Sequence, residues 1–321
     1  MKLRRRTLLA GAAAIAVARP AQAGGRPIVL LVGAPAGSTA DQIARAFAPF
    51  LERHLTRTRI AVANASADAG LAAYRALAEA DPSGDMLGWV ATPGLAARMI
   101  DRGGGDLIER MTLLGALQRE PIAIVAPAAS SIAGVRDLFR RAAAETEAVP
   151  FATPAAGSPP HLAALRLQTV ADRRLNIVAF PSAAAARQAV VAGHVGAAAL
   201  ALSEAITPLR EGKLVGLGIA AHERMGAFPD MAPLRDAGLP LFAFIRRGLA
   251  LPRGAAEDVV LRYKQAMLEV IADPEFRDHA EASGFLPAWM EGAAWHAQIE
   301  AERDVLSRLW AEAPWLPTAG G

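Results

Sequence analysis

IVLLVGAPAGSTADQIAR, residues 28–45, sets the fold class of the whole chain. It opens with the unbroken apolar run Ile28 to Val32, as expected of a parallel strand that is covered on both faces. A turn of small residues, 33–38, follows. Apolar residues then recur at every fourth position and predict one buried face of a helix, namely Ile43, Phe47, Leu51 and Leu55. A strand, a tight turn and a helix in this order indicate an α/β domain.

The same unit returns at residues 149–162, which read VPFATPAAGSPPHL. Val149 to Thr153 predicts a strand, residues 154–158 a turn, and Pro159 the first residue of a helix. After each unit, further short apolar runs alternate with helical patterns as far as about residue 255. From there the chain is expected to be mainly helical. Two α/β blocks and a helical tail predict two lobes, with the tail returning to the first lobe.

The first 23 residues have the pattern of an export signal. A basic head, Lys2 to Arg6, precedes the mildly apolar stretch Leu8 to Ala18 and the cleavage signal Ala21-Gln22-Ala23. Arg5 and Arg6 fit twin-arginine export, and an ordinary Sec signal is the alternative. No later apolar run reaches the length of a membrane span. We therefore expect a mature chain, starting near residue 24, that is soluble in the periplasm.

Composition excludes several classes of function. The chain has no Cys, which removes disulfide scaffolds, thiolate metal sites and cysteine nucleophiles. It has 34 Lys and Arg against 31 Asp and Glu, and five of the basic residues lie in the first 23 positions. The mature chain is therefore close to neutral and has no field that would recruit nucleic acid. The six His form no metal-binding motif, so no metal or cofactor is expected.

The small-residue turn at 33–38 resembles a phosphate-binding P-loop but lacks its lysine, because Ser38 stands at that position. A more general property remains: a turn at a helix N-terminus offers free backbone N–H groups and a positive dipole end to an anion. Ser38 or Thr39 can cap the helix, and Asp41 lies in its first turn. Plain helix capping without a ligand is the alternative interpretation.

The turn at 154–158 allows the same two interpretations, with Ser158 as the expected N-cap. Ser158 and His161 also suggest a nucleophile and its base. No G-x-S-x-G elbow surrounds any Ser, however, and no acidic residue nearby would orient the imidazole, so an exported serine hydrolase is only a minor alternative. The Arg140-Arg141 and Arg246-Arg247 pairs are expected to be solvated edges.

Together the two turns resemble those of a known receptor family. The first reads PAGSTAD at 35–41, with Ala44-Arg45 further along the helix, and the second reads PAAGSPPHL at 154–162. Later stretches fit in order and spacing: residues 212–214, 228–230, 236–240 and 272–275. The sequence resembles the substrate-binding receptors of tripartite tricarboxylate transporters, the Bug receptors. It departs from the family's N-R-P-G-A-G-G stretch, which here reads NASADAG at 64–70.

The resemblance implies a type II periplasmic-binding-protein fold with two lobes, residues 24–127 plus 247–321 and residues 128–246. It implies a monomeric receptor, not an enzyme, that takes a small organic acid from the periplasm to membrane permease subunits. A ligand sensor with a membrane signalling partner is the alternative, and the altered 64–70 stretch leaves a neutral ligand open. The expected ligand-binding residues are Ala36, Gly37, Ser38, Thr39, Ala40, Thr92, Gly157, Ser158, His161 and Ser203.

Overall fold

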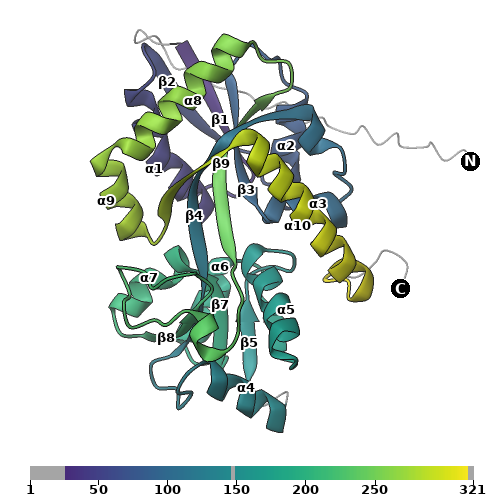
Figure 1. Cartoon of the computed structure of the whole chain (residues 1–321), viewed down its shortest axis with the longest axis vertical. Helices are drawn as coiled ribbons and strands as arrows, with labels where there is room; N and C mark the ends of the chain where they lie inside the picture. The colour runs from purple at the N-terminus through teal and green to yellow at the C-terminus, as the bar shows by residue number, and fades with distance from the viewer. Residues whose placement is uncertain (1–25, 146–148, 317–321) are drawn as a thin grey trace, which may run out of the picture.

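The computed structural model describes residues 26–145 and 149–316. The predicted export signal, residues 1–23, lies outside these described ranges. Figure 1 shows two lobes, one above the other, with long strands running between them. The predicted two-lobed α/β architecture with helices near the C-terminus is therefore confirmed.

The first lobe is built on a mixed sheet. Its strands in spatial order are β2 (Thr58–Asn64), β1 (Arg26–Val32), β3 (Met86–Thr92), β9 (Phe244–Pro252), β4 (Met111–Pro127) and β10 (Leu286–Glu291). Strand β1 is parallel to β2 and β3, whereas β9 is antiparallel to β3 and β4. Val32, the last residue of β1, pairs with Asn64 and with Trp89. The loops that follow β1, β2 and β3 therefore gather at one edge of the sheet.

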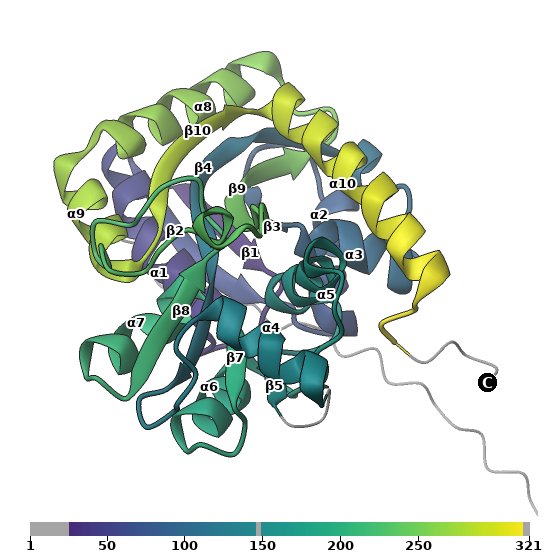
Figure 2. The same ribbon diagram turned by 60° about the horizontal axis from the view of Figure 1, so that its bottom comes forward.

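Helices cover both faces of this sheet, as Figure 2 shows. One face packs on α1 (Thr39–Arg53), α8 (Glu257–Ala272) and α9 (Pro274–Ser283). The other packs on α2 (Leu71–Ala78), α3 (Gly94–Asp101) and α10 (Gly292–Glu312). The apolar residues at every fourth position are buried, as their spacing predicts: Ile43, Phe47 and Leu51 of α1, and Leu55 just after its end.

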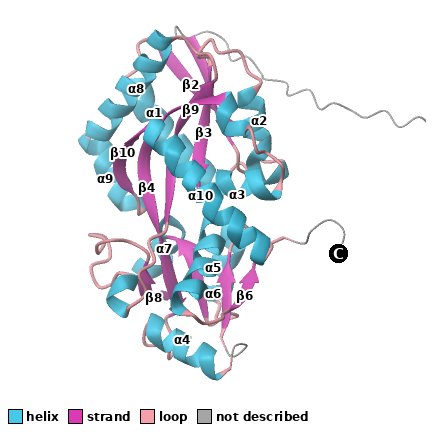
Figure 3. Ribbon diagram, turned by 45° about the vertical axis from the view of Figure 1, so that its right-hand side comes forward, coloured by secondary structure: helices cyan, strands magenta, loops and turns pink. Residues whose placement is uncertain are grey.

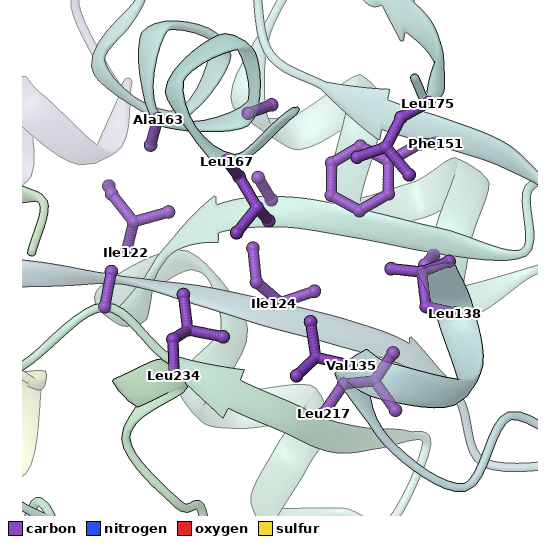
Figure 4. Packing of buried hydrophobic residues seen from close by; sticks show 14 of the residues in the cluster. Ile122, Ile124, Val135, Leu138, Phe151, Ala163, Leu167, Leu175, Leu217 and Leu234 are labelled. Atoms are coloured by element: carbon purple, nitrogen blue, oxygen red, sulfur yellow. The ribbon is translucent and has the colours of Figure 1, made fainter. Parts of the chain in front are cut away.

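The second lobe has its own sheet, flanked by helices as Figure 3 shows. Its strands are the end of β4 together with β7 (Ala197–Ala201), β5 (Pro150–Thr153), β6 (Asn176–Ala179) and β8 (Leu214–Ile219). Its helices are α4 (Val135–Ala144), α5 (Pro159–Ala171), α6 (Ala183–Val191) and α7 (Leu202–Arg210). Figure 4 shows the core, where Ile122 and Ile124 of β4 pack against Leu167 of α5. Short 3₁₀ turns lie at Asp68–Gly70, Leu107–Arg110 and Leu234–Ala237.

Strand β4 belongs to both sheets. Residues Met111 to Pro121 pair with β9, and residues Ile122 to Pro127 pair with β7 or β8. Strand β9 returns alongside it to the first lobe, and helices α8, α9 and α10 follow there. The pair β4 and β9 therefore joins the lobes, and any movement of one lobe against the other must bend these two strands.

One element differs from the expectation that the chain after residue 255 is mainly helical. Residues 286–291 form β10, which pairs with β4 across an irregular register. Most of its residues are only partly buried. Its sequence, LPAWME, does not alternate between apolar and polar residues, which is the pattern by which a half-buried strand is recognised. Pairing with a distant strand, not a local pattern, makes this segment extended. In the described part of the chain, no helix is long and apolar enough to cross a membrane.

Candidate functional site

The two small-residue turns have the same backbone shape. We call residues 33–38 loop 1 and residues 154–158 loop 2. In each loop the last residue, a serine, donates its N–H to the carbonyl three residues earlier, at 3.1 Å in loop 1 and 2.9 Å in loop 2. Gly37 has a φ of 78° and Gly157 a φ of 73°, in the left-handed region that favours glycine. Each loop leads directly into a helix, α1 or α5.

Both serines are N-caps: Ser158 is the predicted cap of α5, and Ser38 is one of the two caps, Ser38 or Thr39, predicted for α1. The Oγ of Ser38 accepts a hydrogen bond from the N–H of Asp41, and the Oγ of Ser158 accepts one from the N–H of His161, both at 3.4 Å. The capped residues bond back to the loops. The N–H of Gly37 donates to Asp41 Oδ2 at 2.8 Å, and that of Gly157 donates to His161 Nδ1 at 3.3 Å. Each loop is thus closed by a reciprocal pair that resembles a capping box.

The two helix N-termini differ in the donors that they leave free. The first N–H groups of a helix have no partner within it, and Ser38 uses only that of Asp41. The N–H groups of Thr39 and Ala40 thus remain for a ligand, beside the hydroxyl of Thr39. In α5 the corresponding residues are Pro159 and Pro160, which have no N–H. The α5 N-terminus therefore contributes its dipole, but no backbone donor from these two positions.

Loop 1 is held by a compact polar network. Asp41 is 1% exposed; its Oδ2 accepts from Arg45 Nε at 2.9 Å and its Oδ1 from Asn64 Nδ2 at 2.9 Å. Arg45 also donates to Asn64 Oδ1 at 2.9 Å. Burial favours the neutral acid, but hydrogen bonds from Arg45, Asn64 and the Gly37 N–H outweigh it and hold the pKa of Asp41 below its usual value. Asp41 is therefore ionised, with its charge offset by Arg45.

Loop 2 is held by the first lobe. Arg98 of α3 donates to the carbonyl of Ala156 at 3.0 Å and pairs with Asp101 at 2.7 Å. Asp101 also accepts from Trp315 Nε1 at 2.7 Å. A Cβ added at Gly157 would lie 1.6 Å from Arg98 and 2.7 Å from the Trp315 ring nitrogen. Loop 2 is therefore clamped against the first lobe, whereas Gly37 has no neighbour within 4 Å of such a Cβ.

Replacing Gly157 with alanine is expected to destabilise the protein more than replacing Gly37. Both changes place a side chain at a positive φ, which costs roughly 1–2 kcal/mol. Only Gly157→Ala also pushes Arg98 away from the Ala156 carbonyl and from Asp101, which adds about 1–3 kcal/mol. The free energy of unfolding of both variants, measured in urea, gives the comparison. Equal losses would show that the clamp on loop 2 contributes no stability.

His161 is a buried, neutral base in this arrangement. It is 6% exposed, and burial together with the nearby charge of Arg98 lowers its pKa to about 4. Because Nδ1 accepts from the Gly157 N–H, the proton of the neutral ring is on Nε2. No acid contacts His161 in the described structure, and its Nδ1 faces Gly157 instead of the Ser158 hydroxyl, so a Ser–His catalytic pair is not assembled.

Lowering the pH should destabilise the folded protein because His161 is buried in its neutral form. The unfolded chain binds this proton below about pH 6.5, whereas the folded protein binds it only near pH 4. The free energy of unfolding therefore falls as the pH drops from 6.5 to 4, by up to about 3 kcal/mol. His161→Asn keeps an acceptor for Gly157 and should flatten this dependence in urea titrations at pH 7, 5.5 and 4. The exposed His194→Asn is the control, and equal slopes in both variants would contradict the assignment.

The remaining residues predicted to bind the ligand differ in how exposed they are. Thr92 is 1% exposed, and its hydroxyl accepts from Trp295 Nε1 of α10 at 3.2 Å. Ser203 is half-buried at the start of α7; its N–H donates to Glu120 at 2.7 Å, and its Oγ has no partner among the described residues. Ala36 is exposed at the tip of loop 1. Their roles as ligand contacts stay predictions.

Four buried polar residues near the joining strands are absent from the predicted set: Tyr74, Gln118, Glu120 and Arg247. Together with the predicted Ser203, which is half-buried, we call them the hinge cluster. Arg247 pairs with Glu120 at 2.6 Å, and their side chains are only 6% and 0% exposed. The expectation that Arg246-Arg247 is a solvated edge is therefore wrong for Arg247. No local pattern could have shown this, because strand pairing brings together residues 127 positions apart.

Arg246 points to the opposite side of β9, because successive side chains alternate between the faces of a strand. There it lines a cavity of about 320 Å³ between α5 and α10, with Glu302 and Phe244. Burial raises the pKa of Glu302. In the described part of the chain, no group of three or more His, Asp or Glu side chains is arranged to hold a metal ion.

The chain is similar to known proteins over most of its length. The sequence model of the tripartite tricarboxylate transporter family receptor, TctC, matches residues 43–306. The chain belongs to this receptor family. Members of the family are solute-binding receptors, so the prediction that the protein is a receptor and not an enzyme is confirmed. A UPF0065 protein of Bordetella bronchiseptica is 29% identical over 90% of this chain and 85% of its own.

Two solved structures of relatives show the same fold. An R. palustris protein with adipate superposes with a TM-score of 0.81, at 20% identity over 91% of this chain and 99% of its own. MatC of Rhodopseudomonas palustris with bound malate gives a TM-score of 0.75, at 23% identity over 88% and 98% of the two chains. The predicted periplasmic-binding-protein fold is therefore confirmed.

Proposed function

We propose that this receptor captures a small organic acid in the periplasm and delivers it to the membrane permease of a tripartite transporter. The observation that carries the proposal is the pair of free N–H groups at Thr39 and Ala40, the first two residues of a fifteen-residue helix, directly after loop 1. Membership of the receptor family supports the transport role. The relatives solved with malate and adipate support an acid as ligand.

The carboxylate is bound mainly at loop 1. Two charge-assisted hydrogen bonds from Thr39 and Ala40 and the Thr39 hydroxyl hold its oxygens. The dipole of α1 adds the equivalent of roughly half a positive charge at this point. Asp41 does not repel the ligand, since Arg45 and two further donors already bind its carboxylate. Loop 2 adds the field of α5 and the Ser158 hydroxyl.

Closure of the lobes follows from ligand contacts that only the closed state makes. We propose the lobe boundaries given above, residues 24–127 plus 247–321 and residues 128–246, with β4 and β9 as the hinge. The clamp from Arg98 to loop 2 already joins the two lobes at loop 2. A bound acid would add a second connection, from α1 to the second lobe.

A screen of organic acids tests this function. An acid that binds the folded protein alone raises its stability by RT ln(1 + [L]/Kd), about 2.7 kcal/mol at a concentration one hundred times Kd. We expect a clear rise in Tm with at least one acid, and a smaller radius of gyration in solution scattering. Native mass spectrometry of gently purified protein would identify a retained ligand. A panel that gives no shift, or a retained ligand without a carboxyl group, would refute the proposal.

A further inference from the structure

The hinge cluster holds an unusual residue, Gln118. Its side chain is 0% exposed, yet neither its amide oxygen nor its amide nitrogen has a hydrogen-bond partner among the described residues. Burying such an amide without partners costs free energy that a partner would recover. Gln118 therefore has hydrogen-bonding capacity that no part of the described protein uses.

The cluster lies where the two lobes meet. Gln118 pairs directly with Arg247 across β4 and β9, and Glu120 lies two residues further along the same face of β4. Glu120 Oε1 accepts from the Ser203 N–H of the second lobe at 2.7 Å. These contacts place the cluster on the hinge strands, between the first turn of α7 and the first lobe.

Tyr74 places the cluster beside the carboxyl edge of the first sheet. Its hydroxyl accepts from the N–H of Ala91 at 3.3 Å, and Ala91 is the next-to-last residue of β3. Ala91 also pairs with Arg247 of β9. Burial raises the pKa of Tyr74, and the charge of Arg247 opposes this, as expected of close neighbours. Loop 1 begins at the end of β1, the strand beside β3, so loop 1 and Ala91 lie at the same edge of the sheet.

The chemistry of the cluster suits an uncharged group. Arg247 and Glu120 form an ion pair, so their charges cancel, and one Glu120 oxygen is already bound to Ser203. Gln118 offers two donors and one acceptor. A hydroxyl or a carboxamide can satisfy both kinds of atom. A carboxylate only accepts, so it could take the N–H donors of Gln118 but would leave the Gln118 oxygen without a donor and would lie beside the charge of Glu120.

We propose that the ligand is a monocarboxylate whose far end carries an uncharged hydrogen-bonding group, a hydroxyl or a carboxamide, which Gln118 binds. This inference rests on the proposed function, in which loop 1 holds the single carboxylate. It agrees with loop 2, where Pro159 and Pro160 provide no backbone donors for a second anion. The ligand class thus differs from malate and adipate, the dicarboxylates seen with two R. palustris proteins.

Calorimetric titration with matched acids tests the inference. Each set holds one chain length constant: glutarate, its monoamide and 5-hydroxypentanoate, then adipate, its monoamide and 6-hydroxyhexanoate. We expect the monoamide or the hydroxy acid to bind at least tenfold more tightly than the dicarboxylate of the same length. Equal or tighter binding of the dicarboxylates would overturn the inference while leaving the proposed function standing. Binding by none of the six acids would also overturn the inference, and the wider screen of organic acids would then decide the proposed function.

Two substitutions test the residues themselves. Gln118→Leu has a similar volume and removes the unpartnered amide, so the protein should fold normally but bind the preferred neutral-ended acid at least tenfold more weakly. Glu120→Gln keeps an acceptor for the Ser203 N–H but leaves the charge of Arg247 uncompensated. The ratio of the affinity for the neutral-ended acid to the affinity for the dicarboxylate should therefore fall at least tenfold. Glu204→Gln, which breaks an ion pair between the buried Glu204 and the partly exposed Arg187 outside the cluster, is the control. Unchanged affinities and ratios in Gln118→Leu or Glu120→Gln would overturn the inference.

Discussion

Replacing Thr39 and Ala40 together with proline is expected to abolish acid binding in a protein that still folds. The double change removes both free N–H groups of α1 and leaves the rest of loop 1 intact. Proline is tolerated in these positions because α5 starts with Pro159-Pro160 after a turn of the same shape. Each lost charge-assisted hydrogen bond is worth roughly 1.5–3 kcal/mol. Calorimetry should therefore show at least a hundredfold weaker binding, with a Tm close to that of the parent protein.

The converse change in α5 is the matched control. Pro159→Thr with Pro160→Ala adds two N–H groups to the other helix and should not weaken binding. If the proline variant of α1 binds the acid as tightly as the parent, the backbone donors at the start of α1 do not hold the carboxylate. If instead the α5 change abolishes binding, loop 2 is the principal contact and the asymmetry between the loops is reversed.

Removing the charge of Arg247 should cause a large loss of stability. Arg247→Met leaves Glu120 buried without its partner, and breaking a buried ion pair in this way typically costs about 3–5 kcal/mol. The double variant Arg247→Met with Glu120→Gln should recover most of this loss, since no buried charge remains. The free energy of unfolding in urea measures both effects.

An exposed ion pair provides the comparison. Lys213 and Glu211 lie 2.8 Å apart with side chains 59% and 48% exposed, and Glu211→Gln should change the stability by at most about 1 kcal/mol. A loss of similar size in Arg247→Met would show that water reaches the Glu120 carboxylate. A double variant as unstable as Arg247→Met would show that the loss comes from packing and not from the unpaired charge.

Features that depend on neighbouring residues could be predicted from the sequence. The strand, turn and helix around Ser38 and Ser158 follow from spacing, turn residues and capping preferences, all within about twenty positions. The structure confirms both N-caps and the helix face at Phe47. The lack of donors at Pro159-Pro160 was also readable from the sequence. What this means for ligand binding depends on the two loops having the same shape, which only the structure shows.

Features that depend on distant pairing could not be predicted. Arg247 reads as a surface arginine because nothing near it in the sequence indicates burial, and only pairing between β9 and β4 brings it to Glu120. Strand β10 is extended for the same reason. The clamp on loop 2 combines Arg98, Asp101 and Trp315, and Trp315 lies more than 200 positions from its partner Asp101.

The amide resonances of loop 1 and of the first residues of α1 give the most direct test of how the ligand is held. In ¹⁵N-labelled protein titrated with the tightest-binding acid, the N–H protons of Thr39 and Ala40 should move strongly downfield, because they form new hydrogen bonds to a carboxylate. The N–H of Gly37 already donates to Asp41 and should move little. Saturable binding without a shift at Thr39 and Ala40 would show that the carboxylate lies elsewhere and would contradict the account.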